Sequence, residues 1–253
     1  MPILEVKNCV KKFGGLMAVK ELDMAIDQGD LFGLIGPNGA GKTTVFNLIT
    51  GMYTPTSGSI LLEGHPIHGK RSSEIAGLGI SRTFQNIRLF KSMTVLENVK
   101  LARHMRKQQG VLDAVLQTSR FLLEEEQIEH DALALLKIFH LETLADELAC
   151  NLPYGSQRRL EIARALATKP KLLCLDEPAA GMNPQESLDL MNLILHLRDE
   201  FHITILLVEH NMKVVMGICE KIQVIDYGET IAIGAPSEIQ HDPKVIEAYL
   251  GGA

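Results

Sequence analysis

The segment from Gly36 to Thr43 reads Gly-Pro-Asn-Gly-Ala-Gly-Lys-Thr, a complete match to the pattern GxxxxGK[ST]. It follows the apolar run 31–35 and precedes a helix-compatible stretch, 44–50. This order of strand, glycine-rich loop and helix is the context in which the pattern holds phosphates. The motif therefore predicts a nucleoside triphosphate site in an α/β fold with a P-loop NTPase core.

The residue types of this loop suit a polyphosphate. Glycines let the backbone N–H groups turn toward phosphate oxygens, and a side chain at Gly39 or Gly41 is expected to block that approach. The following helix adds a positive dipole end. Lys42 is expected to reach the β- and γ-phosphates, and the Thr43 hydroxyl to ligate Mg²⁺. The residues expected to bind ATP here are Gly36, Pro37, Asn38, Gly39, Ala40, Gly41, Lys42, Thr43 and Thr44.

Composition favours a folded domain and argues against several other classes. The 253 residues are 46% hydrophobic and 22% charged, which allows a normal core. A net charge of −6 argues against nucleic-acid binding. The four cysteines form no CxxC pair and indicate reduced cytosolic thiols rather than a zinc site or disulfides. The first residues lack a signal-peptide pattern, and no apolar run reaches the roughly 18 residues of a membrane span, so we expect any membrane role to need a partner.

Hydrophobic patterning predicts the layers of the fold. The first thirty residues alternate like half-buried strands and predict a small N-terminal antiparallel β subdomain. Near-continuous apolar segments at 171–175 and 203–208, separated by the amphipathic stretch 186–200, predict a mostly parallel sheet covered by helices.

The middle of the chain differs from these strands. It is rich in Leu, Ala, Glu, Lys and Gln at helical spacing, without proline and with Gly110 as its one glycine between about 93 and 150. We therefore expect a helical subdomain, approximately 88–160, inserted into a single domain that spans 1–253.

Two carboxylates, Asp176 and Glu177, end the apolar segment that begins at 171. In doubly wound sheets, ligands bind beyond the carboxyl ends of the strands, beside the phosphate loop. Asp176 is then suited to hold Mg²⁺ through water, and Glu177 to accept a proton from the water that attacks the γ-phosphorus. The alternative is that the two residues are a helix N-cap and a first-turn acid before Pro178.

Two further polar residues are expected at the same edge. His210 follows the apolar strand 203–208 almost directly, where it is expected to contact the γ-phosphate; a surface or capping histidine is the alternative. Gln85 is expected to end a short strand before the helical subdomain. It is expected to contact both Mg²⁺ and the attacking water, which would tether that subdomain to the nucleotide.

Taken together in this order, these motifs resemble the ATP-binding cassette family along essentially the whole chain. The resemblance implies that Phe13 stacks on adenine, with a buried core phenylalanine as the alternative. It also implies that the catalytic residues are Glu177, His210 and Gln85. The implied Mg²⁺ ligands are Thr43, Gln85 and Asp176.

The family's LSGGQ signature aligns with 152–156, and the resemblance implies a head-to-tail dimer with two ATP molecules. Each P-loop then faces the partner's signature, here formed by Pro153, Tyr154, Gly155 and Ser156. Two departures stand out, because Pro153 replaces the signature serine and Ser156 replaces the glutamine. Asn183 also replaces the usual aspartate after the carboxylate pair.

Within the family, the chain is similar to the ATPase subunits of bacterial branched-chain (hydrophobic) amino acid importers. The segments that carry this resemblance are 12–16, 82–86, 154–155, 158–164, 177–184 and 245–251. It implies a second ATPase subunit (a heterodimer, or alternatively a homodimer), integral permease subunits and an extracytoplasmic substrate-binding protein. The cytoplasmic face of the inner membrane is the implied location. A lipopolysaccharide-export ATPase and a soluble cassette ATPase of translation or DNA repair are the alternatives.

The segment after Gln85 is expected to couple ATP to the membrane. Ile87, Leu89 and Phe90 place apolar groups where the chain leaves the core, and we expect a groove there to receive a permease helix. Ordinary packing of the helical subdomain is the alternative.

Overall fold

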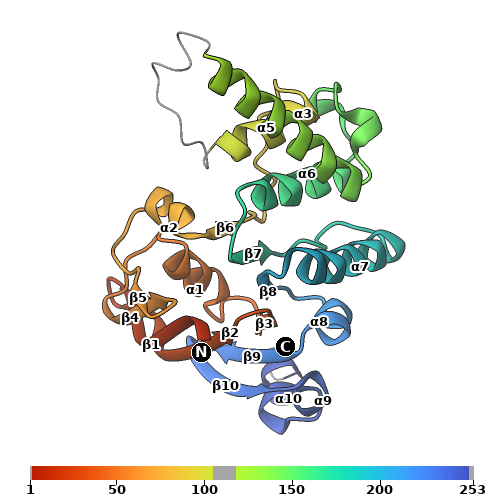
Figure 1. Cartoon of the computed structure of the whole chain (residues 1–253). Helices are drawn as coiled ribbons and strands as arrows, with labels where there is room; N and C mark the ends of the chain where they lie inside the picture. The colour runs from red at the N-terminus through yellow and green to blue at the C-terminus, as the bar shows by residue number, and fades with distance from the viewer. Residues whose placement is uncertain (1, 105–117, 251–253) are drawn as a thin grey trace. The chain divides into compact units, whose positions relative to one another are not determined.

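The computed structural model describes residues 2–104 and 118–250 (Figure 1). The chain divides into two compact units, Met1–Gln85 with Lys171–Ala253, called here the sheet unit, and Asn86–Pro170, called the helical unit. Residues 105–117 of the expected helical subdomain, with Gly110, lie outside the described residues, as does Gly251.

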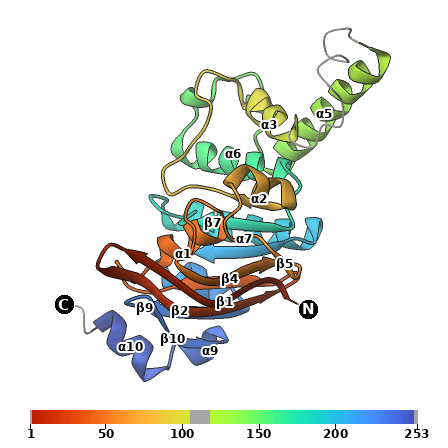
Figure 2. The same ribbon diagram turned by 90° about the vertical axis from the view of Figure 1, so that its left-hand side faces the viewer.

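The antiparallel sheet of the sheet unit has the order β2-β1-β4-β5. Its strands run side by side in Figure 2. They are β1 (Pro2–Phe13), β2 (Leu16–Asp27), β4 (Ser57–Leu62) and β5 (His65–Pro66). Burial alternates along β2, because one face of this sheet packs on the core and the other meets solvent.

The second sheet has the order β10-β9-β3-β8-β7-β6. Its strands are β3 (Leu31–Ile35), β6 (Ile80–Arg82), β7 (Leu172–Asp176), β8 (Thr204–Val208), β9 (Lys221–Asp226) and β10 (Glu229–Gly234). All pairs are parallel except β9 with β10. The predicted fold class is confirmed: a mostly parallel sheet with an antiparallel N-terminal sheet and helices.

This strand order positions the site. Because β3, β8, β7 and β6 are neighbours and parallel, their carboxyl ends lie along one edge of the sheet. The P-loop leaves β3, His210 follows β8, Asp176 and Glu177 end β7, and Gln85 follows β6. Residues distant in sequence are thereby brought to one edge.

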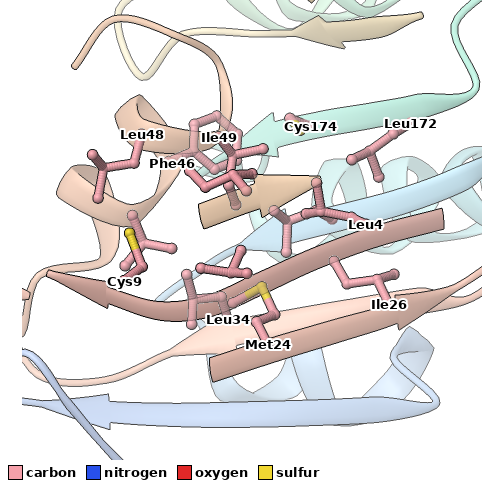
Figure 3. Packing of buried hydrophobic residues seen from close by; sticks show 14 of the residues in the cluster. Leu4, Cys9, Met24, Ile26, Leu34, Phe46, Leu48, Ile49, Leu172 and Cys174 are labelled. Carbon is pink, nitrogen blue, oxygen red and sulfur yellow. The ribbon is translucent and has the colours of Figure 1, made fainter. Parts of the chain in front are cut away.

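The helices of the sheet unit are α1 (Lys42–Ile49), α2 (Ser72–Leu78), α7 (Pro184–Phe201), α8 (Met212–Ile218), α9 (Pro236–Ile239) and α10 (Pro243–Leu250). Helix α1 contributes Phe46 and Ile49 to a buried cluster that also contains Leu4 of β1 and Leu172 of β7 (Figure 3). The helix that follows the P-loop is therefore anchored in the core shared by both sheets.

The helical unit contains α3 (Val95–Arg103), α5 (Ser119–Ile138), α6 (Tyr154–Ala167) and the short 3₁₀ turns η2 (Glu142–Leu144) and η3 (Ala149–Asn151). Its core includes a fully buried ion pair, with Arg158 Nη1 2.9 Å from Glu161 Oε2. The Glu161 carboxylate also accepts the Arg88 backbone N–H at 3.1 Å. Helix α6 thus holds the segment that follows Gln85.

Candidate nucleotide-binding and hydrolysis site

The P-loop runs from a fully buried strand, β3, to α1. A Cβ at Gly36 would lie 2.0 Å from the Ile225 carbonyl oxygen, and one at Gly41 would lie 2.6 Å from that of Ala18. Packing against neighbouring strands therefore requires glycine at both positions. The sequence predicts that a side chain at Gly41 blocks the phosphates, whereas the structure requires glycine there because of the Ala18 carbonyl. Gly39, at φ +82°, has open space where its Cβ would lie.

The Lys42 ammonium lies inside this loop. Its Nζ donates to the carbonyl oxygens of Gly36 at 2.6 Å and Pro37 at 2.9 Å. Burial lowers the pKa of Lys42, while the negative charges of Glu177 and Asp176 oppose that shift. The lysine is therefore placed at the sheet edge, within the field of both carboxylates.

The two carboxylates end β7 in different environments. Asp176 is buried, accepts from Arg82 Nη2 at 3.3 Å, and its N–H donates to Thr83 Oγ1 at 3.2 Å. Glu177 is more exposed and has a φ of +46°, an uncommon conformation for a residue other than glycine. The alternative that these two acids cap and begin a helix is wrong, because α7 begins at Pro184 and Asn183 caps it.

Three of the expected catalytic residues meet at one oxygen atom. Gln85 Nε2 donates to Glu177 Oε2 at 2.9 Å, and His210 Nδ1 lies 3.6 Å from the same oxygen. The His210 side chain is 56% exposed. Strand β6 ends at Arg82, so Gln85 lies three residues beyond it and does not end the strand as expected. The carboxylate of Glu177 is thus the centre of this cluster.

A cavity of about 680 Å³ opens beside the P-loop. Its lining residues are Phe13, Leu16, Met17, Ala18, Lys20, Asn38, Gly39, Ala40, Gly41, Lys42, Thr43, Thr44, Gln85, Glu177 and Tyr227. Gly36, Pro37 and His210 line another cavity of about 880 Å³, which reaches α10. Asp176 lines neither of these two cavities, because its side chain is buried against Arg82.

Phe13 lines the first cavity and is 41% exposed, so the buried-core alternative is wrong. Its ring centroid is 5.2 Å from that of Tyr53 in an edge-to-face arrangement. Lys11 Nζ lies 4.9 Å from the Phe13 centroid and 5.6 Å from the Tyr53 centroid. An exposed aromatic pair with an adjacent cation offers a surface for a planar base.

Sequence reasoning missed Arg82. Its guanidinium stacks on Phe46 and Phe84, with centroids at 4.7 Å and 4.5 Å, and donates to Asn47 Oδ1 at 2.8 Å and Thr50 Oγ1 at 2.9 Å. With its bond to the Asp176 carboxylate, it joins α1 to the end of β7. The dipeptide Arg82-Thr83 carries no local signal of this role, because Asp176 lies 94 positions away.

The residues that could hold Mg²⁺ are the Thr43 hydroxyl, the Gln85 amide oxygen and the Asp176 carboxylate. These are oxygen donors, and Mg²⁺ bound with substrate phosphates needs only one or two carboxylates from the protein. No group of three or more His, Cys, Asp or Glu side chains that could hold a metal occurs among residues 2–104 and 118–250. The three oxygen donors are of the kind that Mg²⁺ uses when it binds together with substrate phosphates.

The expected signature residues lie in the helical unit. Pro153 is the N-cap of α6, and Tyr154 begins the helix, with its hydroxyl 3.4 Å from Arg158 Nη2. Gly155 and Ser156 follow in the first turn and are half-buried. The Gln157 amide donates to the Leu152 carbonyl at 2.8 Å. The helix start is therefore intact despite the changed side chains.

In the same unit, Ile87 and Leu89 are half-buried and Phe90 is 47% exposed. Buried Asn98 holds Phe90 by its backbone, accepting the N–H and donating to the carbonyl, both at 3.0 Å. Arg164 lies 5.4 Å from the Phe90 ring centroid. Phe90 thus combines a fixed backbone with an accessible ring.

Comparisons with known proteins give the same classification as the site. A family model described as ABC transporter matches residues 19–180, and one described as branched-chain amino acid ATP-binding cassette transporter matches 229–253. The chain belongs to the ABC transporter family. Members of this class are ATPases that bind ATP and couple its hydrolysis to transport.

Relatives that align along the full chain show which ABC transport proteins it is similar to. The chain is 46% identical to LivG of Escherichia coli (all of this chain, 99% of LivG) and 47% identical to BraF of Pseudomonas aeruginosa, with the same coverage. Both relatives are high-affinity branched-chain amino acid transport ATP-binding proteins. The lipopolysaccharide export ATP-binding protein LptB of Escherichia coli is 36% identical to this chain, and the alignment covers 99% of this chain and 98% of LptB.

Among solved structures, the ADP conformation of MJ1267, an ATP-binding cassette of an ABC transporter, is 36% identical, with a TM-score of 0.86 and 99% of each chain covered. Along the described ranges, the helices lack the combination of length and apolar character that a membrane span requires.

Proposed function

We propose that this chain is the ATP-hydrolysing subunit of an ABC importer for branched-chain (hydrophobic) amino acids. The observation that carries the enzymatic part is the convergence of Gln85 and His210 on Glu177, at the sheet edge from which the P-loop leaves. The cargo assignment rests on the full-length likeness to LivG and BraF and on the family match at 229–253.

In this proposal ATP binds with its base on Phe13 and its phosphates along the P-loop. The cavity beside the loop is lined by Phe13, by the P-loop, and by Gln85 and Glu177. The backbone N–H groups from Gly39 to Thr44 and the start of α1 attract the phosphates. Lys42 exchanges its two loop carbonyl partners for phosphate oxygens, which form stronger charge-assisted bonds.

Hydrolysis is assigned to Glu177 as the general base. Its carboxylate accepts a proton from the water that attacks the γ-phosphorus, while the Gln85 amide orients that water. His210, opposite the same carboxylate, contacts the γ-phosphate. Thr43, Asp176 and Gln85 would hold Mg²⁺ together with the phosphates, and the ion would neutralise phosphate charge.

The proposed assembly has two ATPase subunits on integral permease subunits, at the cytoplasmic face of the inner membrane, with an extracytoplasmic substrate-binding protein. Each P-loop would face the partner's signature, here Pro153, Tyr154, Gly155 and Ser156. The whole chain, 1–253, acts as one ATPase domain with the helical subdomain as an insertion. A proline at 153 supplies no hydroxyl for the γ-phosphate, so a heterodimer with unequal sites fits this chain better than a homodimer.

Lipopolysaccharide export is the competing function, since LptB also aligns along nearly the full chain. The higher identity to LivG and BraF and the C-terminal family match favour amino acid import. A cassette ATPase acting without a permease is the remaining alternative.

The test is uptake of radiolabelled leucine in cells of the source organism that lack this chain. The wild-type chain should restore uptake, and Glu177→Gln should not. Lys137→Ala, a substitution at the exposed end of α5, is the matched control and should restore uptake fully. Normal leucine uptake without the chain would contradict the cargo assignment; a simultaneous defect in lipopolysaccharide delivery would favour the export function.

A further inference from the structure

Glu209 is a fully buried carboxylate between β8 and His210, with 0% of the residue exposed. Its Oε1 accepts the Ala179 backbone N–H at 2.9 Å. Its Oε2 accepts the N–H groups of His210 at 3.1 Å and Asn211 at 3.2 Å. A buried carboxylate is costly unless it is hydrogen-bonded, and here three backbone donors satisfy it.

These donors belong to two loops that carry different catalytic groups. Ala179 lies in the loop after β7, two residues beyond Glu177. His210 and Asn211 lie in the loop after β8. The loops leave neighbouring strands, since Asp176 pairs with Val208 and the Glu177 N–H donates to the Val208 carbonyl at 2.8 Å. Beyond that bond the strand ladder ends. The Glu209 carboxylate continues the connection by bonding both loops.

We propose that Glu209 is a positioning residue that sets the geometry between Glu177 and His210. Their side chains lie 3.6 Å apart, and Glu177 has a left-handed backbone conformation that its surroundings have to hold. Misplacement of a catalytic group by about 1 Å can cost about 10²-fold in rate. This inference rests on the proposed ATPase function and adds to it a group that does not touch the nucleotide.

Glu209→Gln tests the role with little change in shape. The glutamine amide has one acceptor oxygen and one NH₂ donor, so either Ala179 or the pair His210 and Asn211 must face a donor. One loop is therefore released in either orientation of the amide. Glu220→Gln is the control, because Glu220 also accepts a backbone N–H (Leu31, 3.3 Å) but lies near the start of β9, at the opposite edge of the sheet. The Glu220 side chain is exposed and pairs with Arg198, with Nη1 2.7 Å from Oε1, so this substitution removes hydrogen bonds that lie away from the site.

We expect Glu209→Gln to lower kcat for ATP hydrolysis by about 10-fold to 10²-fold. The KM and the calorimetric Kd for ATP should stay within about twofold, since no P-loop contact is changed. Glu220→Gln should keep the wild-type kcat. A parallel loss of ATP affinity and kcat would overturn the inference, because it would indicate general damage to the fold.

A double-mutant cycle with His210→Ala separates positioning from plain stability. If Glu209 acts through His210, Glu209→Gln should lower kcat by a smaller factor in the His210→Ala background than in the wild-type chain. The two reductions in kcat should therefore not multiply. Amide exchange should also accelerate at 177–182 and 208–213, with α1 unchanged. Multiplicative losses or unchanged exchange would contradict the inference.

Two further outcomes are distinguishable. Absence of ATP hydrolysis by the wild-type chain in its assembled complex would refute the proposed function itself, whereas a wild-type rate in Glu209→Gln would refute only the positioning role. If Glu209→Gln does not fold, Glu209→Asp, which keeps the charge but is too short to reach both loops, takes its place with the same expectations.

Discussion

Two helix N-termini of this chain are candidates for contact with phosphate, and they are built differently. Helix α1 begins at Lys42 after a loop whose glycines, lysine and threonine are contiguous in sequence. Helix α6 begins at Tyr154 after Pro153, and a buried ion pair between Arg158, one turn along, and Glu161, two turns along, holds it. The first site is encoded by one short segment. The second depends on tertiary contacts and, in the proposed assembly, on a partner.

The largest expected effect lies at the first site. Glu177→Gln keeps the shape of the side chain and its bond to Gln85 but removes the proposed general base, so hydrolysis should slow by about 10²-fold to 10⁴-fold. ATP binding measured by calorimetry should be unchanged. Wild-type turnover would show that the proton goes elsewhere, and His210 would be the next candidate.

A comparable effect, on stability rather than chemistry, is expected at the second site. Glu161→Gln leaves Arg158 buried without its anionic partner, which should destabilise the chain by about 3–5 kcal/mol in urea unfolding. Glu142→Gln, at an exposed position in the same unit, should change stability by less than about 0.5 kcal/mol. Equal stabilities would mean that α6 does not depend on the ion pair.

Next in size is the effect of Lys42→Ala. A charge-assisted hydrogen bond contributes about 1.5–3 kcal/mol, so the Kd for ATP should rise by about 10-fold to 10²-fold. Lys137→Ala should leave it unchanged. Unchanged ATP affinity in Lys42→Ala would contradict the assignment of the P-loop to the nucleotide site. The contrast between the starts of α1 and α6 would then no longer hold.

The smallest expected effect concerns Phe13, the residue proposed to stack on adenine. Phe13→Ala should weaken ATP binding by about 0.5–1.5 kcal/mol, the value of an aromatic stacking contact. Affinity for inorganic triphosphate, which lacks a base, should not change. A loss shared by both ligands would indicate that Phe13 supports the P-loop rather than the base.

Much of the site was predictable because its rules act locally. The P-loop pattern depends on glycine conformations and helix-terminal N–H groups within eight consecutive residues. The carboxylates and His210 could be placed because ends of parallel strands meet at one edge. The buried strand patterns also predicted the fold class, which the two sheets confirm.

Other features required the folded chain. Arg82 contacts Asp176, and Glu209 bonds Ala179, only because β6, β7 and β8 are neighbours in the sheet. Gly41 must be glycine because the Ala18 carbonyl of β2 lies against it. Tyr53 completes the aromatic pair with Phe13 from a distant loop.

The sequence by itself determined the class of the fold, the phosphate loop and the identity of the polar residues at the strand ends. Each of these follows from periodicity or backbone sterics over a few residues. Tertiary structure decided which of those residues share a hydrogen bond, which glycines are required by packing, and what holds together the loops that follow β7 and β8. These contacts depend on strand order, and strand order is set by burial of the whole core rather than by any single segment.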